Sequence, residues 1–426
     1  MNVGPGSDER RRRRRLGMGV LDQALSSATN FAPQGFAAAK LGSRGFGTVA
    51  LVVLITTLCV ETVRSMTGEV ALSKGPASGT DRQTLTSAVA VLSGIIGLMY
   101  FGLTIGFSTG ELMRSLIAGA IAVPLISIQD VFRFTSFSSG DLRFAVLSDA
   151  LWCATLALAL LFGLFDSLSP ASLVAWWMIS CVPSAILSIV VRAEKPSCLG
   201  AASWFRSDNW RSVRYLAEYV SDRGSGALGL LLAGAVSGTA IVSAIRSGQL
   251  VVAPVVVIIA GVSYVLAPQA LQRRAESKSI FARWMAVQGV GLAVTAFAVV
   301  ALLPTVPASW GSTLLGHSWA IAVALRYPLG LYVASLAASV VLRAGVRAKD
   351  GEHRSLRMRA FTFPLVLGAP VVGSIADGYR GCMWAVAVAA SIVSVCWLQV
   401  YRSVDRKFQA SLSAPTSCPR SRRWLR

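Results

Sequence analysis

The chain has 426 residues, of which 54% are hydrophobic and only 14% are charged, and its mean hydropathy is +0.61. A soluble domain is about 45–50% apolar and about 25% charged, so this composition argues against a soluble globular protein and predicts a membrane protein with many spans. The formal net charge of +20 would suit nucleic-acid binding, but the positions of the basic residues, described below, argue against that partner.

Twelve mainly apolar segments follow one another along the chain, each about as long as the roughly 20-residue helix that crosses a bilayer. They lie near 17–38, 45–66, 84–106, 111–131, 144–165, 171–191, 213–236, 239–267, 284–304, 319–342, 360–377 and 380–400. None shows the alternation of a transmembrane barrel strand, so each is predicted to be a helix. We therefore expect an all-α polytopic membrane protein with about twelve transmembrane helices, arranged in two six-helix bundles around a central cavity.

Lysine and arginine are distributed unevenly between the two sides of this predicted topology. The N-terminal region, the loops after even-numbered spans and the C-terminal tail hold 33 of the 40 Lys and Arg residues, whereas the opposite side holds four. By the positive-inside rule both termini are cytoplasmic, which requires an even number of spans. The protein is thus predicted to lie in the cytoplasmic (inner or plasma) membrane, and the run Arg10–Arg15 is interpreted as a cytoplasmic charge near anionic lipid.

The same pattern predicts the domain organisation. A basic cytoplasmic tail (1–16) precedes the first bundle (17–191), a cytoplasmic linker (192–212) leads to the second bundle (213–402), and a basic cytoplasmic tail (403–426) ends the chain. The segment 21–31 aligns loosely with 216–226, about 195 residues later. Because each half holds an even number of spans, the two halves are predicted to be a parallel repeat.

Polar side chains of the first span share one face when residues 21–36 are placed on a helix at about 100° per residue. They are Asp22, Gln23, Ser26, Ser27, Thr29, Asn30 and Gln34, and Pro33 lies on the same face. A lipid-exposed carboxylate costs on the order of 3 kcal/mol, so this face must meet other helices or water. Two interpretations follow, a hydrogen-bonded seam between helices or the wall of a hydrophilic cavity, and the number of polar groups favours the cavity.

Other charges lie in later spans. Arg214, Glu218 and Asp222 follow at i, i+4 and i+8, so they share a stripe, while Arg223 points about 100° away from Asp222. Asp130 and Arg133, near an inner boundary, are expected to pair locally. Arg246 and Arg326 lie deeper in their spans, where each either forms a structural ion pair or contacts an anionic substrate.

Enzyme chemistry finds no support in the sequence. No nucleophile elbow, phosphate-binding lysine loop or metal-ligand spacing is present, and the seven cysteines show no CxxC pattern. We therefore expect a protein that is not an enzyme and that uses no cofactor or metal. The lack of a nucleotide-binding loop also argues against a self-contained ATP-driven pump.

Several segments resemble one family of transporters. They are "LDQALSSATNFAPQGFAAAKLGSRGFGTVAL" (21–51), "QDVFRFTSFSSGDLRFAVLSDALW" (129–152), "LAEYVSDRGSGALGLLLAGAVSG" (216–238) and "IRSGQLVVAP" (245–254). They resemble the bacterial polysaccharide-biosynthesis flippases of the multidrug/oligosaccharidyl-lipid/polysaccharide (MOP) exporter superfamily. This resemblance implies a two-lobed helical exporter whose lobes rock to expose a central cavity alternately, and whose substrate is a lipid-linked glycan or polysaccharide precursor.

A lipid-linked glycan carries phosphate and a hydroxyl-rich head, and residues of the cavity are assigned to each part. Substrate-binding candidates are Arg223, Arg246 and Arg326 for phosphate and Gln23, Ser26, Thr29 and Asn30 for sugar; coupling-ion candidates are Asp22, Glu218 and Asp222. The alternatives are a cation-coupled multidrug antiporter of the same superfamily and a non-transporting membrane partner of polysaccharide assembly. Expected partners are the lipid-linked glycan, membrane lipids and glycosyltransferases or a polymerase, with no nucleic acid.

Overall fold

The computed structural model describes residues 5–74, 79–139, 141–163, 168–273, 278–349 and 352–413. Within these ranges the chain is helical apart from short turns and contains no strand, which confirms the predicted all-α class. The helices are α1 (Pro5–Lys40), α2 (Gly42–Met66), α3 (Gly68–Lys74), α4 (Gly79–Phe107), α5 (Gly110–Ser139), α6 (Leu142–Gly163), α7 (Pro170–Arg192), α8 (Cys198–Tyr219), the π-helix η1 (Val220–Gly224), α9 (Ser225–Ser237), α10 (Thr239–Arg273), α11 (Lys278–Ala301), the 3₁₀ turn η2 (Leu303–Thr305), α12 (Ala308–Leu315), α13 (Ser318–Ala324), α14 (Arg326–Ala348) and α15 (Glu352–Ser413).

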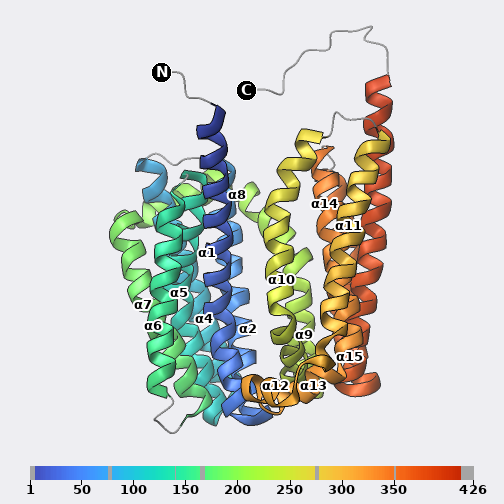
Figure 1. The fold of residues 1–426 in the computed structure, drawn as a ribbon. Coiled ribbons are helices and arrows are strands. Elements are labelled where there is room, and N and C mark those ends of the chain that lie inside the picture. The colour runs from blue at the N-terminus through green and yellow to red at the C-terminus, as the bar shows by residue number, and fades with distance from the viewer. Residues whose placement is uncertain are drawn as a thin grey trace.

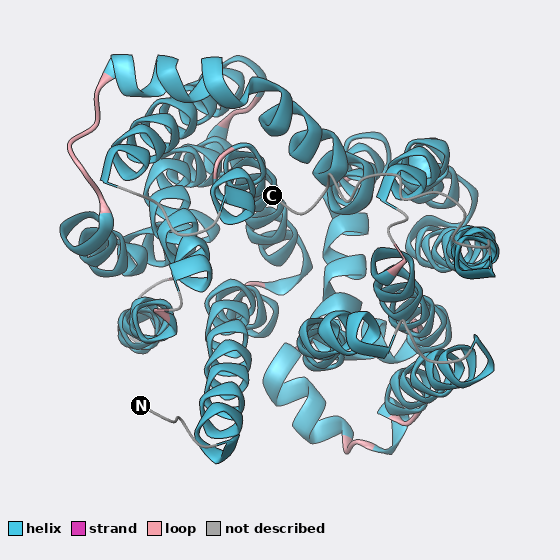
Figure 2. Cartoon of the chain, turned by 90° about the horizontal axis from the view of Figure 1, so that it is seen from above, coloured by secondary structure: helices cyan, strands magenta, loops and turns pink. Residues whose placement is uncertain are grey.

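The helices form two lobes that stand side by side (Figures 1 and 2). The N-terminal lobe contains α1 to α7, and the C-terminal lobe contains α9 to α11, α14 and α15. The short helices α12 and α13 lie at the lower end of the view in Figure 1, whereas α1 begins and α15 ends at the upper end. Both ends of the described chain therefore lie on the same side of the molecule.

All twelve predicted spans fall on helices. Nine helical stretches of the described residues are long and apolar enough to cross a membrane by length and composition, and the last of them, Arg354–Phe408, carries two of the predicted spans. Its backbone turns back at Asp377 and Gly378, where Gly378 adopts the left-handed conformation with φ +51. The backbones of Gly373 and Gly381 then lie against each other, so that α15 is a helical hairpin. The first and seventh predicted spans, on α1 and on α8–α9, are more polar and are not among the nine.

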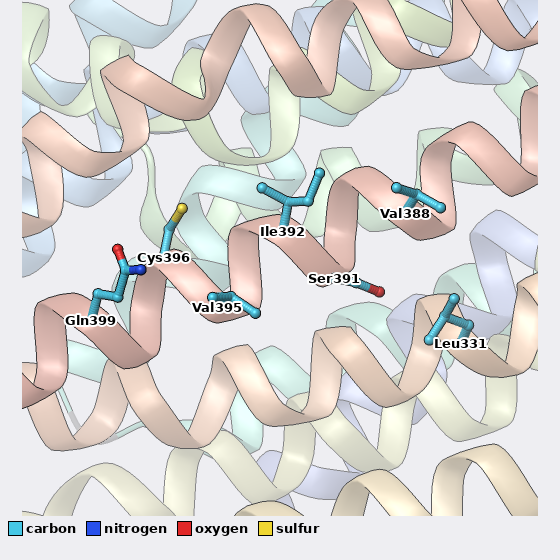
Figure 3. Close-up of a pocket in the computed structure, with 7 residues that line it drawn as sticks. All are labelled: Leu331, Val388, Ser391, Ile392, Val395, Cys396 and Gln399. Atoms are coloured by element: carbon cyan, nitrogen blue, oxygen red, sulfur yellow. The ribbon is translucent and has the colours of Figure 1, made fainter.

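Large apolar side chains cover the outer surface of the bundle. In the most apolar part of Ile280–Thr305 only 11% of the residues are buried inside the molecule. A pocket of about 580 Å³ between α14 and the second arm of α15 is also an outward-facing feature (Figure 3). It is lined by Leu331, Val388, Ser391, Ile392, Val395, Cys396 and Gln399. Because Val388, Ile392 and Val395 are themselves exposed, this groove belongs to a surface that suits acyl chains rather than water.

The two lobes touch at the end that carries α12 and α13. A Cβ atom on Gly47 of α2 would lie 2.9 Å from the carbonyl oxygen of Thr239 of α10, so these two helices meet backbone to backbone. Gly316, between α12 and α13, has φ +54, and a Cβ atom there would lie 2.9 Å from the carbonyl oxygen of Ala38 near the end of α1. Glycine is required where backbones approach this closely, so both contacts depend on the missing side chain.

The segment predicted as a linker, 192–212, differs from that prediction. Cys198–Tyr219 forms α8, which packs against the N-terminal lobe, so the chain reaches the C-terminal lobe only at η1. Trp204 is buried in a core cluster with residues of α2 to α5, and Ser212 donates a hydrogen bond of 2.8 Å to the carbonyl oxygen of Met66. The polar composition suggested a linker, but one stripe of the segment has the side chains to dock on a helical bundle.

The predicted tails are also helical over part of their length. Helix α1 begins at Pro5, and α15 continues to Ser413, well past residue 403. Lys349 forms a buried ion pair with Asp405, and its ammonium group lies 4.4 Å from the ring centre of Phe281. These contacts attach the last turns of α15 to α11 and α14. Residues 414–426 of the predicted tail lie outside the described residues.

Candidate functional site

Arg133 of α5 is the centre of an ion cluster inside the N-terminal lobe. Its Nη1 donates hydrogen bonds to Asp149 Oδ2 of α6 at 3.1 Å and to Ser26 Oγ of α1 at 2.6 Å. Its Nη2 lies 3.8 Å from Asp22 Oδ2. The Arg133 side chain is 7% exposed and both carboxylates are 1% exposed, so the three charges are held away from solvent.

The two carboxylates of this cluster are not equivalent. Asp149 Oδ1 accepts a second hydrogen bond, of 2.8 Å, from Gln129, whose amide also donates to Ser148 Oγ at 3.0 Å. Asp22, in contrast, accepts no hydrogen bond with either oxygen from the described residues. Two carboxylates surround one guanidinium, so when both are ionised the cluster carries one uncompensated negative charge, and Asp22 is its least satisfied member.

Asp22, Ser26 and Thr29 therefore form a seam between α1 and other helices, whereas Gln23, Ser27 and Asn30 are half-buried and hydrogen-bond within α1, so that a cavity wall at these three residues stays a prediction. Besides the contacts of Asp22 and Ser26 with Arg133, the carbonyl oxygen of Thr29 accepts a hydrogen bond of 3.0 Å from Trp177 Nε1 of α7. The amide of Asn30 donates to the carbonyl oxygen of Ser26 in its own helix at 3.0 Å. Periodicity located the polar face correctly, but the counter-charge on α5 could not be read from α1.

The expected local pair of Asp130 and Arg133 does not form. Asp130 pairs instead with Arg64 of α2 at 3.3 Å, and Arg64 also contacts Glu61 of its own helix at 2.8 Å. Arg133 is free for Asp22 and Asp149 because α2 supplies this second arginine.

A second ion cluster lies in the C-terminal lobe around Asp222 in the π-helix η1. Arg343 Nη1 of α14 donates to both carboxylate oxygens at 2.8 and 3.2 Å, and Arg359 Nη2 of α15 lies 3.7 Å from Oδ2. Both guanidinium groups lie near the ring of Trp397, at 6.0 and 5.8 Å from its centre. Here two guanidinium groups surround one carboxylate, so the cluster is positive.

The π-helix separates residues that were predicted to share a stripe. Glu218 pairs with Arg214 at 3.1 Å, as their spacing indicates, but η1 adds a residue to the turn and directs Asp222 into the C-terminal lobe. Arg223 points instead to the N-terminal lobe, where its Nη1 lies 3.8 Å from Glu61 of α2. Adjacent residues of η1 thus contact opposite lobes.

The two clusters occupy equivalent places in the two halves. Asp22 and Asp149 lie on the first and fifth predicted spans and Arg133 lies just after the fourth, while Asp222 lies on the seventh, Arg343 just after the tenth and Arg359 just before the eleventh. Arg343 and Arg359 each follow their N-terminal counterparts by 210 residues. This correspondence agrees with the predicted parallel repeat, and the third member has changed sign, from aspartate to arginine.

Arg246 of α10 has no carboxylate partner among the described residues. Its Nη1 donates a hydrogen bond of 3.1 Å to Gln249, its Nε is buried without a partner, and Tyr332 of α14 is its neighbour. Each arginine of the two ion clusters, in contrast, faces at least one aspartate. Arg246, a half-buried residue, is therefore the cation with the least compensation in this part of the structure.

Arg326 lies at the break between α13 and α14, where it makes local contacts. Its Nη1 donates to the carbonyl oxygen of Val323 at 3.1 Å, and its guanidinium stacks on Tyr327 at 4.4 Å from the ring centre. No hydrogen bond or ion pair of the described residues joins Arg326, Arg246 and Arg223, so the structure does not assemble the three predicted phosphate contacts into one group.

Three residues of the C-terminal cluster were missed by the sequence analysis: Arg343, Arg359 and Trp397. Both arginines stand at the ends of a strongly basic loop, where charge indicates topology, so no signal distinguished them from their neighbours. In the described part of the chain six cysteines are free thiols, and no group of three or more His, Cys, Asp and Glu side chains has metal-binding geometry.

Comparison with solved structures identifies the fold. The chain is similar to an inward-facing multidrug resistance MATE family transporter of the MOP superfamily, with a TM-score of 0.62 and 13% sequence identity over 92% of this chain and 96% of that chain. An outward-facing MATE family structure matches with a TM-score of 0.55 and 12% identity over 93% and 95%. A MOP superfamily transporter from Pyrococcus furiosus matches with a TM-score of 0.54 and 13% identity over 93% and 95%.

These similarities show that the chain has the two-lobed fold of MATE and MOP transporters. No protein-family model matches the sequence, and no curated protein matches it.

Proposed function

We propose that this protein is a flippase that moves a lipid-linked glycan or polysaccharide precursor across the cytoplasmic membrane by alternating access of its two lobes. The fold, the two helical bundles and the apolar outer surface support a transporter of this architecture. The charge of the interior supports an anionic substrate, and Arg246 is the single observation that carries this choice.

The reasoning rests on which charges are already paired. A cationic drug needs acidic groups that no basic side chain compensates, but Asp149 and Asp222 bind arginines and Glu218 binds Arg214, and Asp22, the least satisfied carboxylate, is assigned below to a coupling ion. Arg246, half-buried and without a carboxylate partner among the described residues, would instead favour a phosphate or diphosphate, whose oxygens match the planar guanidinium fork. The structure of a MOP transporter described as having reverse polarity of its binding pocket offers a precedent for such a difference within this fold.

The state of the lobes fits this cycle. The lobes meet at the end that carries α12 and α13, and the charge distribution predicts that this end is extracytoplasmic. Contact between the lobes at this end supports an inward-facing state, in which the protein accepts a substrate from the cytoplasmic leaflet. The higher TM-score with an inward-facing MATE structure than with an outward-facing one supports this assignment.

The N-terminal cluster is the proposed place for a coupling ion. Its uncompensated negative charge and the unsatisfied oxygens of Asp22 suit a proton or a sodium ion. Under this proposal an Asp22→Asn variant would keep the fold, because asparagine is nearly isosteric with aspartate, and lose the dependence of transport on an ion gradient.

Reconstituted protein tests the substrate. Proteoliposomes that carry a fluorescent polyprenyl-diphosphate glycan in one leaflet are expected to move it to the other. Arg246→Ala should slow this movement about tenfold or more, because a hydrogen bond to a charged group contributes about 1.5–3 kcal/mol, whereas Arg246→Lys retains a larger part of the activity. The matched control is Arg114→Ala, which should transport normally because the Arg114 side chain of α5 is 75% exposed.

The alternatives predict different outcomes. A multidrug antiporter would leave the glycan lipid in place and transport cationic dyes, and in cells its loss would cause dye sensitivity with unchanged surface polysaccharide. A non-transporting partner of polysaccharide assembly would move neither substrate. Full glycan transport by a folded Arg246→Ala variant would remove Arg246 from the mechanism.

A further inference from the structure

Helix α8 crosses the ends of several helices at one end of the N-terminal lobe. Its partners change along its length, from Ser87 of α4 beside Gly200, through Lys74 of α3, which pairs with Asp208, to Met66 of α2, which accepts from Ser212. All of these partners lie near the helix ends on the side where α1 begins (Figure 1). The helix therefore runs along this side of the bundle instead of descending into it.

One stripe of α8 packs against the N-terminal lobe. At about 100° per residue, five side chains lie within about 40° of a common direction, and all face the bundle. They are Ala201, Trp204, Asp208, Ser212 and Tyr215, the first four of which are buried. The Lys74 ammonium lies 4.8 Å from the ring centre of Trp204, so an ion pair and a cation–π contact both fix the orientation of α8 about its axis.

The opposite stripe is apolar although it is exposed. Leu199, Trp210 and Val213 point away from the bundle and are 84%, 78% and 45% exposed. Arg206 lies between them on the same stripe, exposed and without an ion pair among the described residues, whereas Arg211 lies beside the inner stripe and pairs with Asp208 at 3.7 Å. A second amphipathic face of this kind on a helix already anchored to its lobe has no partner within the described chain.

This combination of groups matches a membrane–water boundary. Leucine and valine side chains enter the acyl region, the indole ring of tryptophan prefers the headgroup level, and arginines bind lipid phosphates. The cytoplasmic side, where the charge pattern places α8, is also the side that presents anionic headgroups.

We propose that the outer face of α8, formed by Leu199, Arg206, Trp210 and Val213, is a binding surface for anionic phospholipids of the cytoplasmic leaflet. Because α8 continues directly into η1, a lipid that holds this face also holds the segment that joins the lobes. The proposal stands independently of the transported substrate, since it concerns a surface outside both ion clusters.

Depth-dependent quenching of a single label tests this surface. A Trp210→Cys substitution in a full-length background without other cysteines, labelled with a fluorophore and reconstituted in vesicles, places the reporter on the proposed face. We expect brominated phosphatidylglycerol to quench the label about fivefold more effectively per molecule than brominated phosphatidylcholine in 3:7 mixtures, because one basic residue near an anionic surface contributes about 1 kcal/mol. Adding Arg206→Gln should abolish this preference while quenching by both lipids persists.

The control reporter is Glu194→Cys, an exposed polar position in the turn before α8, which should remain accessible to iodide in water and unquenched by either lipid. Absence of lipid quenching at position 210, in a protein that elutes as a single species, would overturn the proposal and leave the face for a protein partner. Equal quenching by the two lipids would also overturn it, because the face would then contact the membrane without selecting anionic headgroups.

Discussion

Removing the Arg133 side chain tests the N-terminal cluster most directly. Arg133→Ala would leave Asp22 and Asp149 facing each other across a buried site with no counter-charge, and three contacts of 2.6 to 3.8 Å would be lost. Breaking a buried ion pair by removing one partner costs about 3–5 kcal/mol, because the remaining charge stays buried. We therefore expect the free energy of unfolding to fall by about this amount, a change of roughly two to three and a half orders of magnitude in the ratio of folded to unfolded protein.

Equilibrium unfolding in mixed detergent micelles measures this free energy. Arg114→Ala serves as the matched control, since Arg114 lies on the same helix α5, is 75% exposed, and contacts Glu111 only at 3.9 Å. An exposed pair contributes about 0–1 kcal/mol, so the control should unfold nearly as the parent does.

A compensated variant separates charge from packing. Arg133→Met combined with Asp22→Asn and Asp149→Asn removes all three charges while keeping similar volumes, and it should recover most of the lost stability. If Arg133→Ala unfolds like Arg114→Ala, or if the compensated variant is no more stable than Arg133→Ala, the account of a buried ion cluster is wrong.

Two further predictions follow from the same structure. Gly47→Ala should lower the free energy of unfolding by about 1–3 kcal/mol in the same assay, because the added Cβ atom would lie 2.9 Å from the carbonyl oxygen of Thr239, and an unchanged free energy would contradict the backbone contact between α2 and α10. In the same unfolding assay, Asp222→Ala should lower the free energy of unfolding several-fold more than Arg223→Ala, because Asp222 compensates two guanidinium groups whereas the Arg223 side chain is 71% exposed. Equal losses would refute the placement of Asp222 in the C-terminal ion cluster.

The helices were predictable because each apolar run is long enough to cross a bilayer, and this signal is local. The hairpin of α15 followed from the break near Asp377, where glycine permits the turn. Helix α8 was missed because its composition is polar on average. The spacing of Trp204 and its neighbours along the helix reveals the buried stripe, but this spacing can be interpreted only once the lobe that covers the stripe is known.

The partners within the two clusters could not be predicted for a different reason. Asp22 and Arg133 are 111 positions apart, and a helical wheel shows which face of α1 is polar without showing what lies opposite. The same wheel was compatible with a seam and with a cavity wall, and the number of polar groups alone favoured the cavity. At η1 an α-helical wheel gives the wrong side-chain directions, because a π-turn shifts the phase of every later residue. Asp222 therefore leaves the stripe of Glu218.

The opposite charges of the two clusters suggest how one fold handles two kinds of solute. The equivalent spans of both halves supply an aspartate and an arginine, and only the third position differs, Asp149 in one lobe and Arg359 in the other. This single difference makes the N-terminal cluster negative and the C-terminal cluster positive, and Arg246 adds a further cation to the second lobe. Under the function proposed above, a coupling cation would bind in the first lobe and an anionic headgroup in the second, so that neither solute has to displace the other. Exchanging the third members, by Asp149→Arg together with Arg359→Asp, should reverse this preference. The dependence of glycan transport on an ion gradient would measure the reversal.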